Sequence, residues 1–255
     1  MRHFLPLLVL WFAFTAQATE TQSLRLLSYN IHAGIGVDRV FDLERIAKVI
    51  REAEPDIVAL QEVDRKTQRS KGIDIAKELA TLTGMDFVFA ESIRFQGGQY
   101  GNAVLTNLPI QSSQTIPIPE KVSVEKRSLL SVVLLWQGKP IQVLSTHLCH
   151  REEANRLAAA KLISTMNPKL DSPSFLLGDL NALPESEPLR VLSESGWQKP
   201  SQKPQFTVPV DTPTRQIDYV LFRAEDELAI KVKEVRVLEE KTASDHRPIL
   251  VVLEW

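Results

Sequence analysis

The sequence predicts one α/β domain in which two β-sheets pack face to face and helices cover their outer faces. Apolar runs of strand length recur along the chain, and a few amphipathic helical patterns lie between them. Runs such as residues 56–60 and 174–177 are continuously apolar, which indicates strands that are covered on both faces. The order strand, helix, strand, helix, strands occurs before about residue 110 and again after about residue 129. This repetition favours two sheets within a single domain.

In the first half of the chain, strands are predicted at residues 24–29, 57–60, 87–90 and 103–105, where apolar residues cluster. Asp42 is a typical helix N-cap, and the apolar residues behind it repeat at helical spacing, at Leu43, Ile46, Ala47 and Ile50. A second helix is predicted from the apolar face formed by Ile75, Ala76, Leu79 and Leu82.

In the second half, apolar runs predict strands at residues 129–136, 141–144, 175–177, 217–222, 230–237 and 249–253. The turn sequence at residues 137–140 indicates a hairpin between the first two of these strands. A third helix is expected from 152 to 166 and a short fourth near 189–192. The Pro-rich stretch 200–213 predicts a long irregular loop, which is either an ordinary surface connection or a loop that shapes the substrate site.

The composition is that of a globular domain. The chain has 255 residues, of which 44% are hydrophobic and 24% charged, so disordered, collagen and coiled-coil proteins are excluded. Its 30 Lys and Arg residues balance 32 Asp and Glu residues, which gives a net charge of -2. Such a chain has no overall positive field to hold a polyanion. We therefore expect no stable complex with nucleic acid. We also expect a monomer.

The first eighteen residues predict a signal peptide. Arg2 and His3 precede an apolar run at residues 4–14, and Ala16-Gln17-Ala18 matches a signal peptidase site. We expect cleavage after Ala18, a mature domain at 19–255, and a periplasmic or secreted protein. A buried N-terminal strand and an uncleaved anchor are the alternatives. Cys149 is the only cysteine, so no internal disulfide can form.

Polar residues gather where the predicted strands begin or end. They are Ser28–Asn30, Gln61–Glu62, Thr146–His147, Gly178–Asn181, Asp218 and Ser244–His246. When strands of alternating direction share a core, their ends can meet at one rim, so these acids, amides and imidazoles are typical of a functional site.

The donor types favour a hard metal and phosphate-ester chemistry. Glu62, Asp179, Asn30 and Asp245 offer oxygen ligands, which suit Mg2+ or its substitute Mn2+. The sequence lacks HExxH and a cysteine pair, which disfavours a soft metal. It also lacks a P-loop and a GxSxG motif, so a P-loop nucleotidase and a serine esterase are disfavoured.

Seven short segments in sequence resemble the endonuclease/exonuclease/phosphatase superfamily, the metal-dependent phosphoesterases related to DNase I. The segments are 28–30 (SYN), 55–62 (PDIVALQE), 100–106 (YGNAVLT), 145–147 (STH), 178–181 (GDLN), 217–219 (IDY) and 244–246 (SDH). Each is weak alone, whereas all seven appear in the order of the family. The resemblance implies a four-layer α/β sandwich and a divalent-metal-dependent hydrolase.

The resemblance also implies a metal site. Glu62 would bind the metal with help from Asn30, and Asp245 would contribute to the same cluster. Some family nucleases carry an acid where this chain has His32, so the number of metals, one or two, stays open.

Catalytic roles follow from the same resemblance. Asp179 would orient or deprotonate the attacking water, and Asn181 would hold a phosphate oxygen. His246, oriented by Asp218, and His147 would donate hydrogen bonds to the phosphoryl oxygens. Which histidine is the acid and which is the base stays open.

Three further residues are candidates for substrate binding. Tyr100 and Asn102 would line the phosphate pocket, although packing and turn roles are equal alternatives. Arg127 stands where related sequences often carry a basic residue, although a charge at a strand entry explains it equally well. No role follows for His150 and Cys149.

We therefore expect a Mg2+-dependent phosphoesterase that acts on phosphodiesters or phosphomonoesters, with the natural substrate left open. A sphingomyelinase-like or inositol-lipid-directed enzyme is one alternative, and a non-catalytic metal- or phosphate-binding module is another. Four basic residues within 64–71 could grip a polyanion or form a solvated loop.

Overall fold

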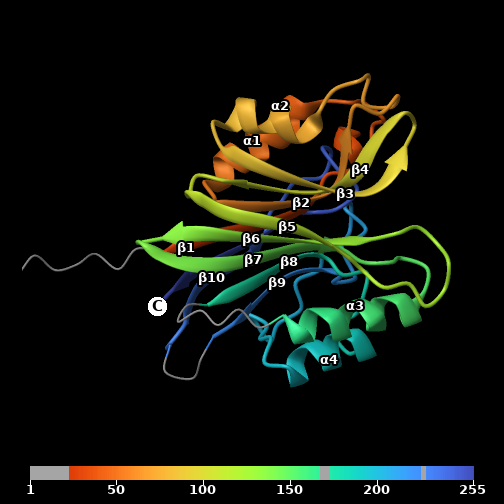
Figure 1. The fold of residues 1–255 in the computed structure, drawn as a ribbon. Coiled ribbons are helices and arrows are strands. Elements are labelled where there is room, and N and C mark those ends of the chain that lie inside the picture. The colour runs from red at the N-terminus through yellow and green to blue at the C-terminus, as the bar shows by residue number, and fades with distance from the viewer. Residues whose placement is uncertain (1–22, 167–172, 225–227) are drawn as a thin grey trace, which may run out of the picture.

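The computed structural model describes residues 23–166, 173–224 and 228–255. Two β-sheets pack face to face at its centre (Figure 1). The six-stranded sheet has the order β10 (Lys231–Val237), β11 (Ile249–Glu254), β1 (Leu24–Asn30), β2 (Ile57–Arg65), β4 (Gly98–Thr106), β3 (Asp86–Phe95). The five-stranded sheet has the order β5 (Ile110–Pro117), β6 (Ser128–Trp136), β7 (Lys139–His147), β8 (Ser174–Asp179), β9 (Asp218–Arg223).

Helices cover both outer faces of this pair of sheets. Figure 1 shows α1 (Leu43–Ala53) and α2 (Ile75–Thr83) on one side, and α3 (Glu153–Thr165) and α4 (Glu187–Glu194) on the other. The predicted four-layer α/β sandwich is therefore confirmed. Asp42 caps α1 as predicted, because its carboxylate accepts a hydrogen bond from the backbone N–H of Arg45.

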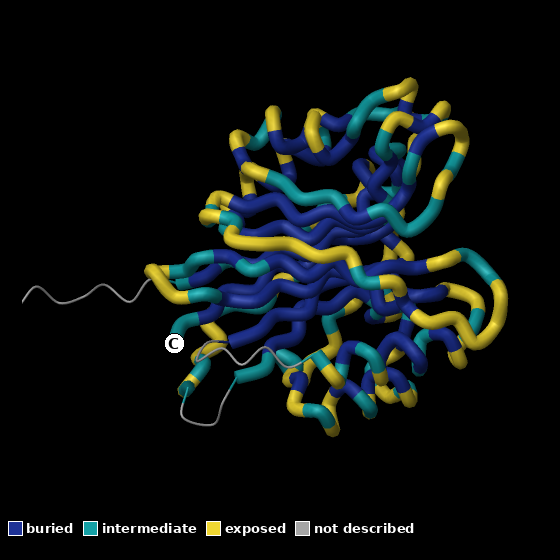
Figure 2. Tube along the Cα trace, viewed as in Figure 1, coloured by how far each residue is buried: buried dark blue, intermediate teal, exposed yellow. Residues whose placement is uncertain are grey.

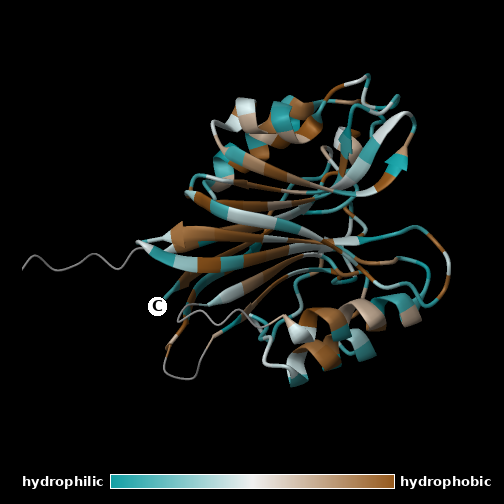
Figure 3. Ribbon diagram, viewed as in Figure 1, coloured by the Kyte–Doolittle hydropathy of each residue, from teal (hydrophilic) through white to brown (hydrophobic). Residues whose placement is uncertain are grey.

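Buried apolar side chains fill three spaces, one between the sheets and one beneath each pair of helices. Leu26 and Ile57 from one sheet meet Val143 and Leu177 from the other in the central core. The middle strands are buried along their length (Figure 2) and carry the most hydrophobic residues (Figure 3). Their continuously apolar sequences follow from this burial on both faces.

The pairing directions bring several strand ends to one edge. β1 and β2 are parallel, with Asn30 opposite Gln61, and β7 and β8 are parallel, with His147 opposite Asp179. β9 runs antiparallel to β8, so Asp218 at its start lies opposite Asp179. The two sheets thus present their polar strand ends to each other.

Two features of the sheets differ from the sequence prediction. The strand β5 was not predicted, because its sequence IQSSQTIP is polar and the strand lies exposed at a sheet edge. β10 and β11 come from the second half of the chain, yet they pair within the sheet of the first half. The division at about residues 110–129 therefore separates most strands but not these two.

The remaining predictions concern segments around the sheets. Residues 200–213 form an irregular loop, as expected. The proposed signal peptide, residues 1–18, lies outside the described residues. No helix in the described part of the chain is long and apolar enough to cross a membrane.

Candidate active site

A cleft of about 370 Å³ opens where the polar strand ends meet. Seven of the residues chosen from the sequence line it: Glu62, Tyr100, Arg127, His147, Asp179, Asn181 and His246. The fold thus brings together side chains that are far apart in sequence, and the largest separation is the 184 positions between Glu62 and His246. Asp218 and Asn30 lie behind this wall and bond to residues in it.

Asp179 lies at the centre of the site, at the end of β8. One of its carboxylate oxygens, Oδ2, lies 3.4 Å from Nε2 of His147 and 3.8 Å from Nε2 of His246. The preceding Gly178 permits this approach, because a Cβ atom there would lie 2.0 Å from the carbonyl oxygen of Thr146. Glycine therefore lets β8 lie close enough to β7 for Asp179 to face His147.

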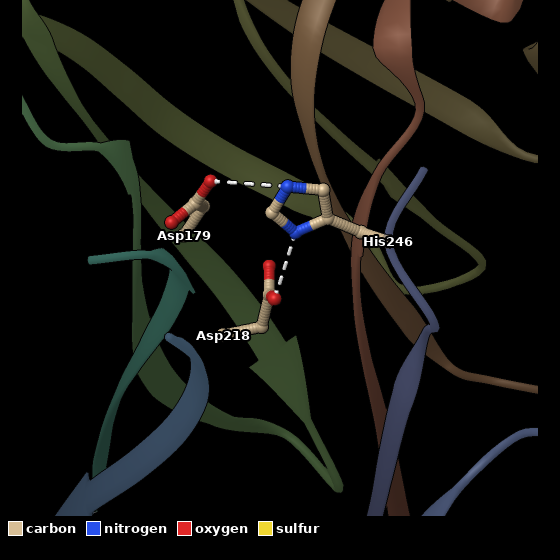
Figure 4. A group of neighbouring side chains, drawn as sticks. All are labelled: Asp179, Asp218 and His246. Carbon is tan, nitrogen blue, oxygen red and sulfur yellow. Dashed lines mark hydrogen bonds and ion pairs between the residues drawn. The ribbon is translucent and has the colours of Figure 1, made fainter. Parts of the chain in front are cut away.

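Asp218 orients His246 from the other side of the ring. Figure 4 shows Asp218 at Nδ1 and Asp179 near Nε2. The Nδ1–H group donates to Oδ2 of Asp218 at 2.9 Å, and the hydroxyl of buried Thr207 donates to the same oxygen. Burial alone would lower the pKa of His246, but the charge and hydrogen bond of Asp218, together with Asp179, raise it to about 10. His246 is thus an imidazolium at neutral pH, with Nε2–H available as a donor.

His147 has the opposite electrostatic character. Burial, reinforced by the positive charges of Arg127 and His246, places the pKa of His147 well below its usual value. Its Nδ1 atom has no hydrogen-bond partner among the described residues. His147 is therefore neutral at pH 7, and it can donate from one ring nitrogen only.

Burial also raises the pKa of Asp179, and the nearby charge of Asp218 raises it further. Opposing effects come from His246, from the backbone N–H of Asn181 and from the amide of Asn30. The pKa of Asp179 reaches about 7, which is close to that of an effective general base at neutral pH.

A β-bulge places Glu62 in the cleft. The pairing of β2 with β4 shifts between Leu60 and Val63, and Glu62 has a positive φ of 58°. The Nδ2 group of Asn30 donates to Oε1 of Glu62 at 3.2 Å and to Oδ2 of Asp179 at 3.1 Å. One amide thus holds the two carboxylates side by side.

These carboxylates fit a hard divalent cation. Glu62 lines the cleft, is only partly buried and lies beside Asp179, so its oxygens are accessible to an ion. Ligand atoms of Asp179, Asp218 and His246 also lie within 4.8 Å of one another. However, His246 and Asp218 bond to each other, and an imidazolium repels a cation. The donor chemistry therefore favours Glu62 as the centre of a metal site.

Asn30 and Asp245, the other predicted metal ligands, have different surroundings. The amide oxygen of Asn30 accepts from the backbone N–H of His32, so its amide nitrogen is the group that faces the two acids. Asp245 is half-exposed, lies 4.0 Å from Nδ1 of His32, and is not among the cleft-lining residues in the described part of the chain. Metal binding by either residue stays a prediction.

The predicted substrate-binding residues divide into two groups. Asn181, Tyr100 and Arg127 line the cleft, and Arg127 pairs with Glu125 at 3.0 Å. Asn102 is buried, donates to the carbonyl oxygen of Ser128, and does not line the described part of the cleft. A packing role explains its position, and substrate binding by Asn102 stays a prediction.

Sequence reasoning missed several residues of the site. Thr207 lies in the Pro-rich loop, where no pattern indicates that its hydroxyl reaches Asp218. Ile93 and Phe95 line the cleft from β3, and Arg69 lines it from the loop after β2. Arg69 belongs to the cluster of four basic residues within 64–71. This cluster was the one sequence signal that could have pointed to the cleft.

Comparison with known proteins matches residues 27–246 to the endonuclease/exonuclease/phosphatase family. The chain belongs to this family. Its members are phosphoesterase hydrolases that depend on divalent metals, which agrees with the acids and histidines around the cleft.

Family relatives cover nearly the whole chain. The uncharacterized protein YbhP of Escherichia coli (strain K12) is 27% identical over 246 residues, which are 91% of this chain and 96% of that protein. A family structure from Beutenbergia cavernae DSM 12333 is 26% identical, with a TM-score of 0.75, and covers 91% of this chain and 71% of that one.

Two more distant structures share the fold. A mannosyl-6-phosphatase from Bacteroides thetaiotaomicron VPI-5482 is 17% identical, with a TM-score of 0.74, and covers 91% of this chain and 100% of its own. D. rerio TDP2 complexed with a single-strand DNA product is 16% identical, with a TM-score of 0.72 and coverages of 91% and 99%.

Proposed function

We propose that this protein is an exported phosphodiesterase that uses Mg2+, or Mn2+ in its place. The observation that carries the proposal is the convergence on one oxygen of Asp179: both histidines and the amide of Asn30 lie within 3.8 Å of it. An acid, a charged imidazole and a neutral imidazole at one point supply the groups that phosphate-ester hydrolysis needs.

The chain's own residues divide the work. Asp179, with its raised pKa, orients the attacking water and accepts its proton. Nε2–H of His246 and the neutral ring of His147 donate hydrogen bonds to the phosphoryl oxygens, where negative charge accumulates. Asn181, fixed by hydrogen bonds to Asp179 and Leu148, would hold a further phosphate oxygen. A divalent cation held at Glu62 with Asp179 beside it would supply Lewis-acid stabilisation.

The charges around the cleft favour a phosphodiester over a phosphomonoester. Arg127 pairs with Glu125, and Arg69 pairs with buried Asp64, so each positive charge is largely neutralised. Beyond His246 and a cation that Glu62 would hold, the described lining of the cleft therefore offers little positive charge for the second negative charge of a monoester. These charges favour a singly charged diester.

The test is hydrolysis of bis-p-nitrophenyl phosphate by the purified mature chain with Mg2+ or Mn2+. We expect EDTA and His246→Ala each to remove most of the rate. His32→Ala is the matched control, because His32 is more exposed and does not line the cleft in the described residues. A rate that EDTA and His246→Ala both leave unchanged would show that the site is wrongly assigned.

A panel of natural phosphate esters separates the proposed activity from its alternatives. Duplex DNA, RNA, sphingomyelin and inositol phosphates represent the nuclease, sphingomyelinase-like and inositol-directed enzymes. If the protein hydrolyses none of these esters and does not hydrolyse the nitrophenyl ester either, a binding module on the same scaffold is favoured.

Export is proposed from residues 1–18, and a monomeric mature chain is proposed with it. Expression of the full chain in a bacterial host, followed by N-terminal sequencing of the periplasmic fraction, tests the first point. We expect a chain that begins at Thr19, and a cytoplasmic chain that keeps residues 1–18 would contradict export.

A further inference from the structure

One wall of the cleft has no role in the proposed reaction. It consists of Arg69, Ile93 and Phe95, which are partly exposed, and of the buried Tyr100, which also lines the cleft. The two aromatic rings come from the hairpin of β3 and β4, whereas Arg69 comes from the loop after β2. We call the three partly exposed residues, Arg69, Ile93 and Phe95, the ring wall.

Buried Asp64 locks the guanidinium of Arg69 in place. Nε and Nη2 of Arg69 donate to the two carboxylate oxygens of Asp64, at 2.6 and 2.9 Å, and Asp64 is fully buried. The Thr67 hydroxyl donates to the same carboxylate. This two-bond pairing fixes the plane of the guanidinium and cancels most of its charge. Nη1 of Arg69 has no hydrogen-bond partner among the described residues.

The guanidinium and the aromatic rings form one rigid, largely apolar surface. Cζ of Arg69 lies 4.8 Å from the centre of the Phe95 ring and 5.6 Å from that of Tyr100. The two ring centres are 6.3 Å apart. Such cation–π contacts hold the guanidinium against its neighbours. Arg69, Phe95 and Tyr100 all line the cleft, and Ile93 lines it with them.

We propose that the ring wall is a subsite for an uncharged planar ring of the substrate, of nucleobase or aryl size, close to the phosphate that is cleaved. This inference rests on the proposed function, because it assumes that the phosphate binds near Asp179 and Glu62. Arginine planes and aromatic side chains are the surfaces on which such rings stack.

The charges and the size of the cleft disfavour other occupants of this subsite. A second anionic group is disfavoured, because Asp64 cancels the charge of Arg69 while Glu62 and Glu125 line the same cleft. A polyol is puckered and carries hydroxyl groups around its rim, so it covers less of the Phe95 and Ile93 side chains than a planar ring does. A cleft of about 370 Å³ is at the small end of ligand pockets, so it fits a phosphate with one attached ring group and not a duplex.

The experiment compares two ribose phosphate esters. One carries a planar base, and the other has the anomeric hydroxyl group in its place. Uridine 5′-phosphate and ribose 5-phosphate are titrated into the mature chain with Mg2+ by calorimetry. We expect the uridine ester to bind at least about fivefold more tightly, the lower end of the contribution of one stacked base. We expect Phe95→Ala to remove most of this difference and to leave the affinity for ribose 5-phosphate unchanged. Ile93→Ala should reduce the difference by a smaller factor.

The chain contains a matched control for the aromatic change. Arg65 pairs with Asp74 and lies 5.7 Å from the centre of the Phe89 ring, an arrangement like that of Arg69, Asp64 and Phe95. These residues do not line the cleft in the described part of the chain. Phe89→Ala should therefore leave the difference between the two esters intact, and thermal unfolding checks that each variant folds.

Two results would overturn the subsite. One is equal affinity of the unmodified chain for the two esters, and the other is a ring-dependent difference that survives in Phe95→Ala. Calorimetry needs no turnover, so its result is independent of the proposed hydrolysis. Loss of the ring effect in Phe95→Ala, in a protein that hydrolyses no ester, would support the subsite and refute the phosphodiesterase.

Discussion

Replacement of Asp218 by Asn tests how the site sets the protonation of His246. The amide oxygen of the isosteric Asn can still accept the Nδ1–H hydrogen bond of His246, but the negative charge of the Asp218 carboxylate is lost. In the native site the pKa of His246 is about 10, against 6.5 for a free imidazole. Since a tenfold change in proton affinity is about 1.4 kcal/mol, the site favours the imidazolium by roughly 5 kcal/mol after the opposing effect of burial is included.

Loss of the Asp218 charge should shift both limbs of the pH–rate profile to lower pH. The pKa of His246 should fall, because burial then opposes the charged ring with less compensation. The pKa of Asp179 should also fall, because the charge of Asp218 contributes to raising it. In the native protein we expect activity to rise as Asp179 ionises near pH 7 and to decline as His246 loses its proton near pH 10.

The assay is the pH dependence of kcat/KM for bis-p-nitrophenyl phosphate, with nuclear magnetic resonance titration of the His246 ring. At pH 8 we expect Asp218→Asn to lose a factor of about 10²–10⁴, the range of general acid–base assistance. A variant profile that superimposes on the native one, or a His246 resonance that titrates at the native pH, would refute the reasoning.

Three further changes test the supporting structure. Gly178→Ala should destabilise the fold by about 1–3 kcal/mol in urea unfolding, because its Cβ would meet the Thr146 carbonyl oxygen; unaltered stability would contradict the close strand approach. Thr207→Val should reduce kcat several-fold with little change in KM, because Asp218 loses a hydrogen bond, and a change in KM alone would argue against that role. The midpoint of thermal unfolding should fall between pH 7 and pH 10. The pKa of His246 is higher in the folded than in the unfolded chain, so the stability that the charged ring contributes is lost as the pH rises through this window. A midpoint that rises over the same window would contradict this assignment.

The sequence predicted the layers of this fold because buried strands and amphipathic helices leave strong periodic patterns. Continuous apolar runs identified the central strands, and Asp42 identified the start of α1. The strand β5 could not be predicted in this way, because an exposed edge strand buries few side chains. The return of β11 to the first sheet, with β10 beside it, depends on the pairing of β11 with the distant strand β1, which no local pattern records.

The candidate site was predictable as a set of residues and not as a geometry. Polar residues at strand ends identified Asp179, His147 and His246. The bulge that turns Glu62 into the cleft has no recognisable sequence signal, because Gln61 and Glu62 would also fit a regular strand end. Thr207 was missed because its partner lies in a strand that begins eleven residues later.

The central claim is that Glu62 holds a divalent cation, with Asp179 beside it, in the same cleft that binds the phosphate ester. Mn2+ titration of the mature chain, followed by electron paramagnetic resonance, tests it in Glu62→Gln and in Glu125→Gln, which removes a second cleft carboxylate that pairs with Arg127. We expect Glu62→Gln to weaken Mn2+ binding by at least about tenfold and Glu125→Gln to leave it near the native value. Native Mn2+ affinity in Glu62→Gln would contradict the account.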